Sequence, residues 1–212
     1  MIRNHSRIQK ICQILKTRYP DVKTQLNHRN AFQLLVATIL SAQCTDRQVN
    51  AVTPNLFEKL KTPEDFARAP IETIEALIHS TGFFHNKAKN IQNCARLLTE
   101  RFDSKVPDTL DELIQLPGVG RKTANVVLGA VFGIPGMVVD THVARISKRL
   151  GLTASADPVK IESDLMAVIP KSEWNDFSLW LIYFGRSVCT ARKPDCPNCF
   201  LTHLCPYPDK RT

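Results

Sequence analysis

The chain of 212 residues has few aromatic side chains and no long apolar stretch. Phe, Trp and Tyr together make up 7% of it, so the core must be mostly aliphatic. No apolar run approaches the roughly 20 residues that a membrane-spanning helix needs. The N-terminus also lacks the apolar segment and small-residue cleavage site of a secretory signal. These absences argue against a membrane protein and a secreted protein, and they predict a cytoplasmic one.

Alternation of apolar and polar residues, the signature of strands, is also missing over any useful length. Low-complexity tracts and repeats are absent as well. The sequence therefore predicts an all-α fold of many short helices. Residues 31–42 are apolar nearly all round and predict a buried helix. Pro54 falls inside the next helical pattern, 47–60, and is expected to kink or split that helix.

Two further helices are predicted to be amphipathic. Residues 6–18 carry apolar side chains on one face and basic ones elsewhere, which favours a helix docked on a core with a solvated basic face. A helix is also expected over 86–101. Its apolar side is Ile91, Ala95 and Leu98, and its solvent side is Lys87, Lys89 and Arg96.

Residues 116–140 read LPGVGRKTANVVLGAVFGIPGMVVD and begin with a tight turn. Pro117 presets its own φ, and Gly118 and Gly120 are expected to take backbone angles closed to other residues. A short helix before this turn and a second one over 121–132 make a helix, a hairpin and a helix. Bare backbone N–H groups and the positive end of the second helix favour an anion there, such as a DNA phosphate.

Arg121 and Lys122 occupy the first turn of that second helix, where cations are mildly unfavourable. Their presence therefore needs a reason. Either both only contact phosphates, or one of them reacts, and the turn alone leaves both interpretations open. The formal net charge of +8 favours a polyanionic partner.

Seven cysteines, an odd number in a chain of this length, argue against a disulfide scaffold and for a reducing compartment. Four of them lie near the C-terminus, separated by six, two and five residues. They are Cys189, Cys196, Cys199 and Cys205. Four thiolates in so short a span predict a metal centre, and a single close pair favours [4Fe–4S] over zinc, which commonly takes two close pairs.

The segment between the first two of these cysteines is basic. Arg192 and Lys193 lie in it, and a metal centre is expected to fold it so that its charges meet a phosphate. The other cysteines, Cys12, Cys44 and Cys94, are scattered and are interpreted as core or incidental thiols.

Four motifs together resemble the endonuclease III family of bifunctional DNA glycosylases and abasic-site lyases. They are LPGVGRKTAN at 116–125, VDTHV at 139–143, SAQCTD at 41–46 and the C-x6-C-x2-C-x5-C tail. The resemblance covers nearly the whole chain. It implies a six-helix barrel lobe over 24–133, with the helix-hairpin-helix at about 108–132, and an iron–sulfur cluster lobe made of 1–23 plus 134–212.

The resemblance also implies roles for individual residues. Lys122 is the implied nucleophile and Asp140 the catalytic carboxylate. Gln43 fills the hole left by the flipped base, and Phe83 stands at the wedge position, where the family usually has an aliphatic residue. Without the family, a solvated loop glutamine and a core phenylalanine would be favoured. The remaining implied DNA-contacting residues are Gly118, Val119, Gly120, Arg121, His142, Arg192 and Lys193, although His142 alone is more often structural.

The implied reaction removes oxidised pyrimidines and cuts the strand 3′ to the abasic site. The amine at position 122 must lose its proton, attack C1′ and form a Schiff base, after which β-elimination follows. Asp140 is expected to act mainly on the positive charge that develops on the sugar, and the same carboxylate also suits a helix N-cap. The implied cofactor is a [4Fe–4S] cluster. The partner is double-stranded DNA with damaged bases or abasic sites, bound by a monomer at a bacterial nucleoid.

Two other functions remain open from the sequence. One is an adenine-mismatch glycosylase relative, which shares the hairpin and the cysteine spacing. Lys122 and the end of the sequence at Thr212 argue against it, since that family lacks the lysine and has an extra C-terminal domain. The other is a non-catalytic DNA-binding module with a structural metal.

Overall fold

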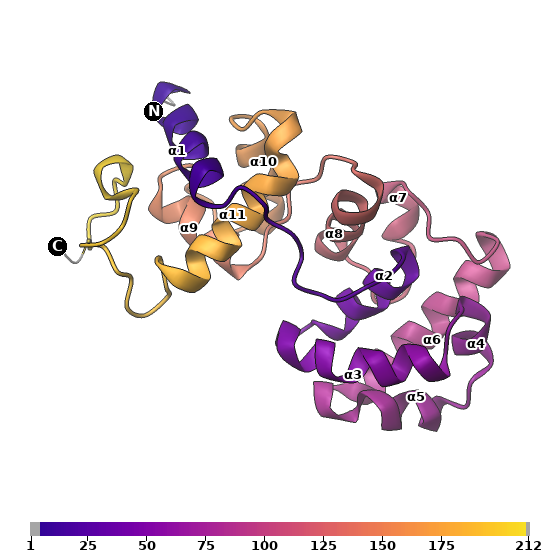
Figure 1. The fold of residues 1–212 in the computed structure, drawn as a ribbon. Helices are drawn as coiled ribbons and strands as arrows, with labels where there is room; N and C mark the ends of the chain where they lie inside the picture. The colour runs from indigo at the N-terminus through magenta and orange to yellow at the C-terminus, as the bar shows by residue number, and fades with distance from the viewer. Residues whose placement is uncertain (1–4, 211–212) are drawn as a thin grey trace. The chain divides into compact units, whose positions relative to one another are not determined.

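The computed structural model describes residues 5–210, and every regular element within them is a helix (Figure 1). The prediction of an all-α fold is therefore confirmed. The α-helices are α1 His5–Arg18, α2 Ala31–Leu40, α3 Asp46–Lys59, α4 Pro63–Arg68, α5 Ile71–Ile78, α6 Phe84–Arg101, α7 Leu110–Leu113, α8 Arg121–Phe132, α9 Thr141–Arg149, α10 Pro158–Met166 and α11 Trp174–Ser187. Short 3-10 turns are η1 His79–Thr81, η2 Lys171–Glu173 and η3 Thr202–Leu204.

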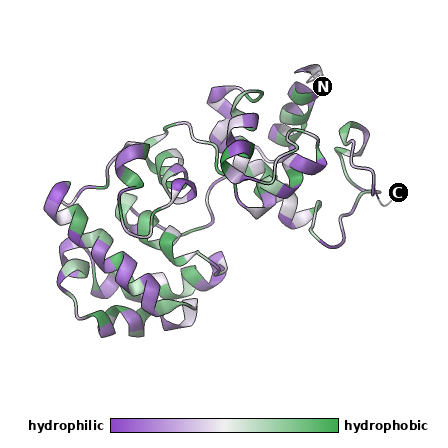
Figure 2. Ribbon diagram, turned by 180° about the vertical axis from the view of Figure 1, so that it is seen from behind, coloured by the Kyte–Doolittle hydropathy of each residue, from purple (hydrophilic) through white to green (hydrophobic). Residues whose placement is uncertain are grey.

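The chain forms two compact units. Thr24–Ile134 makes up the first, called here the hairpin unit, and Met1–Lys23 with Pro135–Thr212 makes up the second, called the cysteine unit. Most helices of both units mix hydrophilic and hydrophobic residues along their length (Figure 2), as amphipathic helices do. Among the described residues, no helix combines the length and the hydropathy that crossing a bilayer requires.

The hairpin unit is built around α2, which contacts α3, α6 and α8. Asn30 caps this helix, since its side chain accepts a hydrogen bond from the Gln33 N–H at 2.9 Å. From Leu34 to Leu40 every residue is buried, so the prediction of a buried helix is confirmed. The next helix, α3, continues through Pro54 without a break, so the proline does not split it.

Helix α6 buries one stripe against this core, including Ala88, Ile91, Ala95 and Leu98. Lys87 belongs to the same stripe and is only 5% exposed. The prediction that Lys87 faces solvent is wrong, because residues four positions apart share a helix face and Lys87 lies four before Ile91.

The cysteine unit joins the two ends of the chain. Helix α1 packs on α11, and it buries the apolar face that the sequence predicts, formed by Ile8, Ile11, Cys12 and Leu15. The Trp180 indole N–H donates to the Tyr19 carbonyl at 3.0 Å. Arg7 donates to the Leu150 carbonyl at 3.0 Å and to the Leu204 carbonyl at 2.8 Å. These bonds hold the N-terminal helix to segments more than 140 residues away.

Candidate active site and metal centre

The hairpin between α7 and α8 has one position that only glycine can fill. Gly118 has a φ of +79°, and a Cβ on it would lie 2.9 Å from the Asn90 Cβ. Gly120 differs, because its φ is −92° and an added Cβ would meet nothing within 4 Å. The predicted need for glycine-only angles is therefore wrong at Gly120. What glycine provides there is open space above the backbone, where an anion can approach.

Gly120 is the N-cap of α8, and no side chain caps this helix end. Arg121 and Lys122 follow it in the first turn, and both side chains are exposed. Val119 differs from its neighbours, because its side chain is 6% exposed and packs into the core. Its N–H donates to the Leu116 carbonyl at 3.0 Å. The hairpin therefore presents backbone and cations outward and anchors itself through Val119.

Asp140 begins α9 in the cysteine unit. Its Oδ1 accepts a hydrogen bond from the Val143 N–H at 2.8 Å, which makes it the N-cap of the helix, as the sequence predicts. The cap uses one oxygen of the carboxylate. The residue is half-buried.

His142 lies two residues further on and is half-buried. Burial lowers the pKa of this imidazole, the charges of Arg145 and Arg186 lower it as well, and Asp140 opposes them. Arg145 Nη2 lies 3.2 Å from His142 Nδ1. A backbone hydrogen bond with Gly185 acts on the same imidazole and raises its pKa.

Gln43 and Phe83 lie on two loops of the hairpin unit. Both are non-glycine residues in the left-handed region, with φ of +52° and +50°. Both are exposed, Phe83 at 65%. The interpretation of Phe83 as a core residue, which its residue type alone favours, is therefore wrong. Each of the two loops presents one side chain to solvent from a strained backbone.

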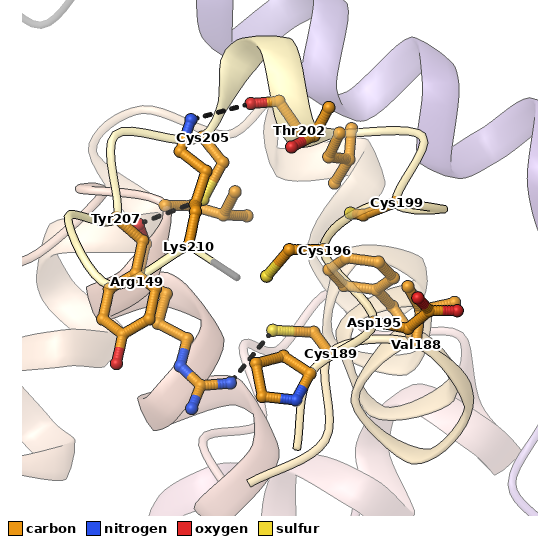
Figure 3. A pocket seen from close by; sticks show the side chains of 14 residues that line it. Arg149, Val188, Cys189, Asp195, Cys196, Cys199, Thr202, Cys205, Tyr207 and Lys210 are labelled. Atoms are coloured by element: carbon orange, nitrogen blue, oxygen red, sulfur yellow. Dashed lines mark hydrogen bonds between the residues drawn. The ribbon is translucent and has the colours of Figure 1, made fainter. Parts of the chain in front are cut away.

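The four C-terminal cysteines surround a single pocket of the cysteine unit (Figure 3). None of the cysteines in the described residues forms a disulfide. Burial raises the pKa of the Cys199 thiol, and the charges of the other three cysteines raise it further. Four thiols that line one pocket are the donor set that a metal centre takes as thiolates. The residues present therefore fit an iron–sulfur cluster.

The sequence spacing of these thiols also bears on the kind of centre. Structural zinc sites commonly take two close pairs of cysteines, whereas these four ligands include one close pair, Cys196 and Cys199, which favours [4Fe–4S].

Of the remaining thiols, Cys12 and Cys94 are buried, and burial raises the pKa of each to about 12.

Arg149 ties the pocket to the basic segment. Its Nη1 lies 3.3 Å from Cys189 Sγ, a contact drawn in Figure 3, and donates to the Thr190 carbonyl at 2.8 Å. Its Nη2 donates to the Ala191 carbonyl at 3.0 Å. Arg192 and Lys193 follow and are exposed. The basic segment is therefore held at Thr190 and Ala191 by Arg149, and its exposed charges follow at Arg192 and Lys193.

The structure groups the sequence-predicted residues by unit. The hairpin unit holds Gln43, Phe83, Gly118, Val119, Gly120, Arg121 and Lys122, and the cysteine unit holds Asp140, His142, Arg192, Lys193 and the four cysteines. Two residues with evident roles were missed. Lys87 had a signal, its spacing from Ile91. Arg149 had none, because its partner Cys189 is 40 residues away.

Comparisons with known proteins agree with this geometry. A family model described as HhH-GPD superfamily base excision DNA repair protein matches residues 36–171. A second, the iron-sulfur binding domain of endonuclease III, matches 189–205. The chain is 55% identical to endonuclease III of Synechocystis sp. over 207 residues, which cover 97% of this chain and 94% of that protein. It is 48% identical to endonuclease III of Bacillus subtilis over 194 residues, covering 91% and 89%.

A solved structure is similar as well. It is a trapped endonuclease III–DNA covalent intermediate, with a TM-score of 0.93 and 47% identity. The match covers 98% of this chain and 97% of that one.

Proposed function

Because the chain belongs to the endonuclease III family of base-excision DNA repair proteins, we propose that it uses Lys122 as nucleophile and Asp140 as catalytic carboxylate. It is a DNA glycosylase and abasic-site lyase. Its proposed substrates are oxidised pyrimidines in duplex DNA and abasic sites, bound by a monomer in the bacterial cytoplasm. The observation that carries the assignment of the nucleophile is an exposed lysine in the first turn of α8, directly after the uncapped glycine hairpin.

The reaction needs an amine without its proton. The Lys122 nitrogen forms a bond to C1′ of the deoxyribose while the bond from C1′ to the damaged base breaks, and the base leaves with that electron pair. Opening of the sugar ring gives a Schiff base. This acidifies the C2′ proton, and its loss expels the phosphate from C3′, which cuts the strand on the 3′ side. A water nucleophile would remove the base and stop there.

Asp140 supports this step by its charge. As C1′ loses the base, positive charge develops on the sugar, and a carboxylate nearby stabilises that charge. The N-cap bond at Oδ1 holds the carboxylate in one orientation. Asp140 therefore needs no proton of its own to act, only a fixed negative charge.

The target nucleotide must leave the base stack before this attack. Gln43 and Phe83, exposed on their loops, are the proposed residues that enter the duplex, the first to fill the hole and the second as the wedge. The backbone of the hairpin and Arg121 bind phosphate, and so do Arg192 and Lys193. These contacts position the DNA without reading its sequence.

When bound, the iron–sulfur cluster supplies sulfur–iron links that hold the C-terminal segment together. Cys189, Cys196, Cys199 and Cys205 are the residues that would hold it, and [4Fe–4S] is the form that their spacing in the sequence favours. Arg149 keeps the first of these thiolates and the basic segment in one arrangement.

Borohydride trapping tests this function. Reduction converts the Schiff base to a stable amine, so wild-type protein with an abasic duplex should give a covalent protein–DNA adduct. Lys122→Gln should give none, because it keeps the approximate length of the side chain and removes the nucleophile. Lys105→Gln is the control, an exposed lysine outside the proposed site. Absence of the adduct with wild-type protein would refute the lyase mechanism.

A further inference from the structure

The loop that carries Phe83 has an unusual backbone. It consists of η1, His79–Thr81, followed by Gly82 and Phe83, and is called here the wedge loop. Gly82 has a φ of +69° and Phe83 a φ of +50°. No side chain caps α6, the helix that begins directly after Phe83. A bulky residue rarely adopts left-handed angles, so other contacts must hold the loop in this form.

Lys87 makes those contacts from the first turn of α6. Its Nζ donates to the Thr81 carbonyl at 2.8 Å, and its backbone N–H donates to the Phe83 carbonyl at 3.1 Å. The two bonds lie on either side of Gly82. Thr81 is held in turn, since its hydroxyl donates to the Ile78 carbonyl at 2.8 Å. A single residue therefore bridges the bend in the wedge loop.

Lysine is an unfavourable residue at this buried position of α6 unless its charged ammonium makes a hydrogen bond that the structure needs. Lys87 is 5% exposed, and burial lowers the pKa of its ammonium, an effect that a negative charge on Cys44 would oppose. Methionine or leucine would continue the apolar stripe of α6 at no such cost. The Lys87 ammonium thus serves as the hydrogen-bond donor to one carbonyl of the wedge loop, that of Thr81.

The second inserting loop lies close to the first. Cys44, which is near enough to influence the Lys87 ammonium, directly follows Gln43. Helix α3, whose N-cap is Thr45, packs against η1, and Gln48 Nε2 donates to Ser80 Oγ at 2.7 Å. These contacts connect the two loops. A residue that fixes the wedge loop therefore also fixes its position relative to the loop of Gln43.

We propose that Lys87 is a positioning residue, which fixes the wedge loop so that Phe83 enters the duplex in register with Gln43. The inference rests on the proposed roles of Phe83 and Gln43. Lys87 itself touches neither DNA nor the reacting atoms, and it acts through the Thr81 and Phe83 carbonyls.

Two substrates separate this role from a purely structural one. In a duplex, the abasic nucleotide must leave the base stack, and the wedge must separate it from the opposite strand. A single strand has no opposite strand to separate. Loss of a positioning residue should therefore slow the duplex reaction and leave the single-strand reaction unchanged. Loss of a residue needed only for folding should slow both equally.

Lys87→Met retains the unbranched stem and removes the N–H donors of the ammonium. We expect its single-turnover lyase rate on the abasic duplex to fall by about 10- to 100-fold, the scale of a small misplacement, with the single-strand rate unchanged. Lys87→Arg should restore much of the duplex rate, since it keeps donors at this position. Lys89→Met is the matched control, because it removes the same charge from an exposed position of the same helix. It should behave as wild type.

A double-mutant cycle with Phe83→Ala tests the route of the effect. If Lys87 acts through Phe83, adding Lys87→Met to Phe83→Ala should cause little further loss. An unchanged duplex rate in Lys87→Met, an equal loss on both substrates, or full additivity with Phe83→Ala would each overturn the inference. Borohydride trapping with wild-type protein is independent of all of these, so a failure here is distinguishable from failure of the proposed function.

Discussion

At the scale of single residues, Asp140 has two tasks that different substitutions can separate. Its Oδ1 accepts the Val143 N–H and caps α9. Its negative charge is the proposed catalytic feature. Asparagine and aspartate are about equally good N-caps, whereas alanine is a poor one. Replacement by the amide therefore removes the charge and keeps the cap.

Asp140→Asn should bind DNA and unfold in urea like wild type while losing most of its turnover. Asp140→Ala should lose the same turnover and also about 1 kcal/mol of unfolding free energy, since the cap is gone. Urea denaturation and single-turnover rates on the same preparations check both statements. If Asp140→Asn turned over at the wild-type rate, the assignment of the carboxylate would be wrong.

The sequence predicts the role of a residue well where the interaction partner is close to it in the chain. Asp140 as a cap follows from its place before a helix, and Thr45, which precedes α3, caps that helix by an equally local bond from the Gln48 N–H. Phe83 is different. A phenylalanine usually packs in a core, and its exposure here follows from a left-handed backbone that no neighbour in sequence signals. Only the resemblance to a known family predicted its role.

At the scale of elements, the hairpin depends on its two glycines for different reasons. Gly118 needs both a positive φ and room beside Asn90. Gly120 has ordinary backbone angles and open space. One glycine therefore serves the fold, and the other leaves the backbone accessible to phosphate.

Gly118→Ala should lower the free energy of unfolding by about 1 kcal/mol or more, the cost of a left-handed residue, with an added clash against Asn90. Gly120→Ala should change stability by less than about 1 kcal/mol. It should nevertheless weaken DNA affinity about tenfold, the value of one hydrogen bond to a charged group. Thermal unfolding and fluorescence anisotropy measure the two effects. A stable Gly118→Ala, or a Gly120→Ala that binds DNA normally, would contradict this division.

The periodicity of the sequence was sufficient for the helices and less so for their details. The all-α fold, the buried α2 and the docked α1 were all predicted. Pro54 was expected to kink or split α3, and of these two outcomes the split does not occur, because the helix continues through the proline. The contact of Arg149 with Cys189 joins α9 to the C-terminal segment, and no local pattern reports contacts of that range.

At the scale of the whole molecule, the excess of positive charge is +8. Such a charge favours DNA without specifying where it binds. The fixed basic segment of Arg192 and Lys193 is the proposed contact with phosphate in the cysteine unit, and the hairpin is the proposed contact in the other unit. Family membership, not charge, identifies the reaction.

The salt dependence of binding should report these contacts one by one. Arg192→Ala should reduce the slope of log affinity against log salt concentration by about 1, the value for one phosphate contact. Lys105→Ala, an exposed cation not assigned to DNA, should leave the slope unchanged. Titrations at several salt concentrations provide both numbers. Equal slopes for wild type and Arg192→Ala would remove that residue from the interface.

The proposed mechanism requires a bond between the Lys122 nitrogen and the sugar. Its most direct test is to digest the borohydride-trapped complex and locate the sugar remnant on the protein by mass spectrometry. We expect the added mass on Lys122, within the peptide that follows the glycine hairpin. A remnant on another lysine or on the N-terminal amine would contradict it.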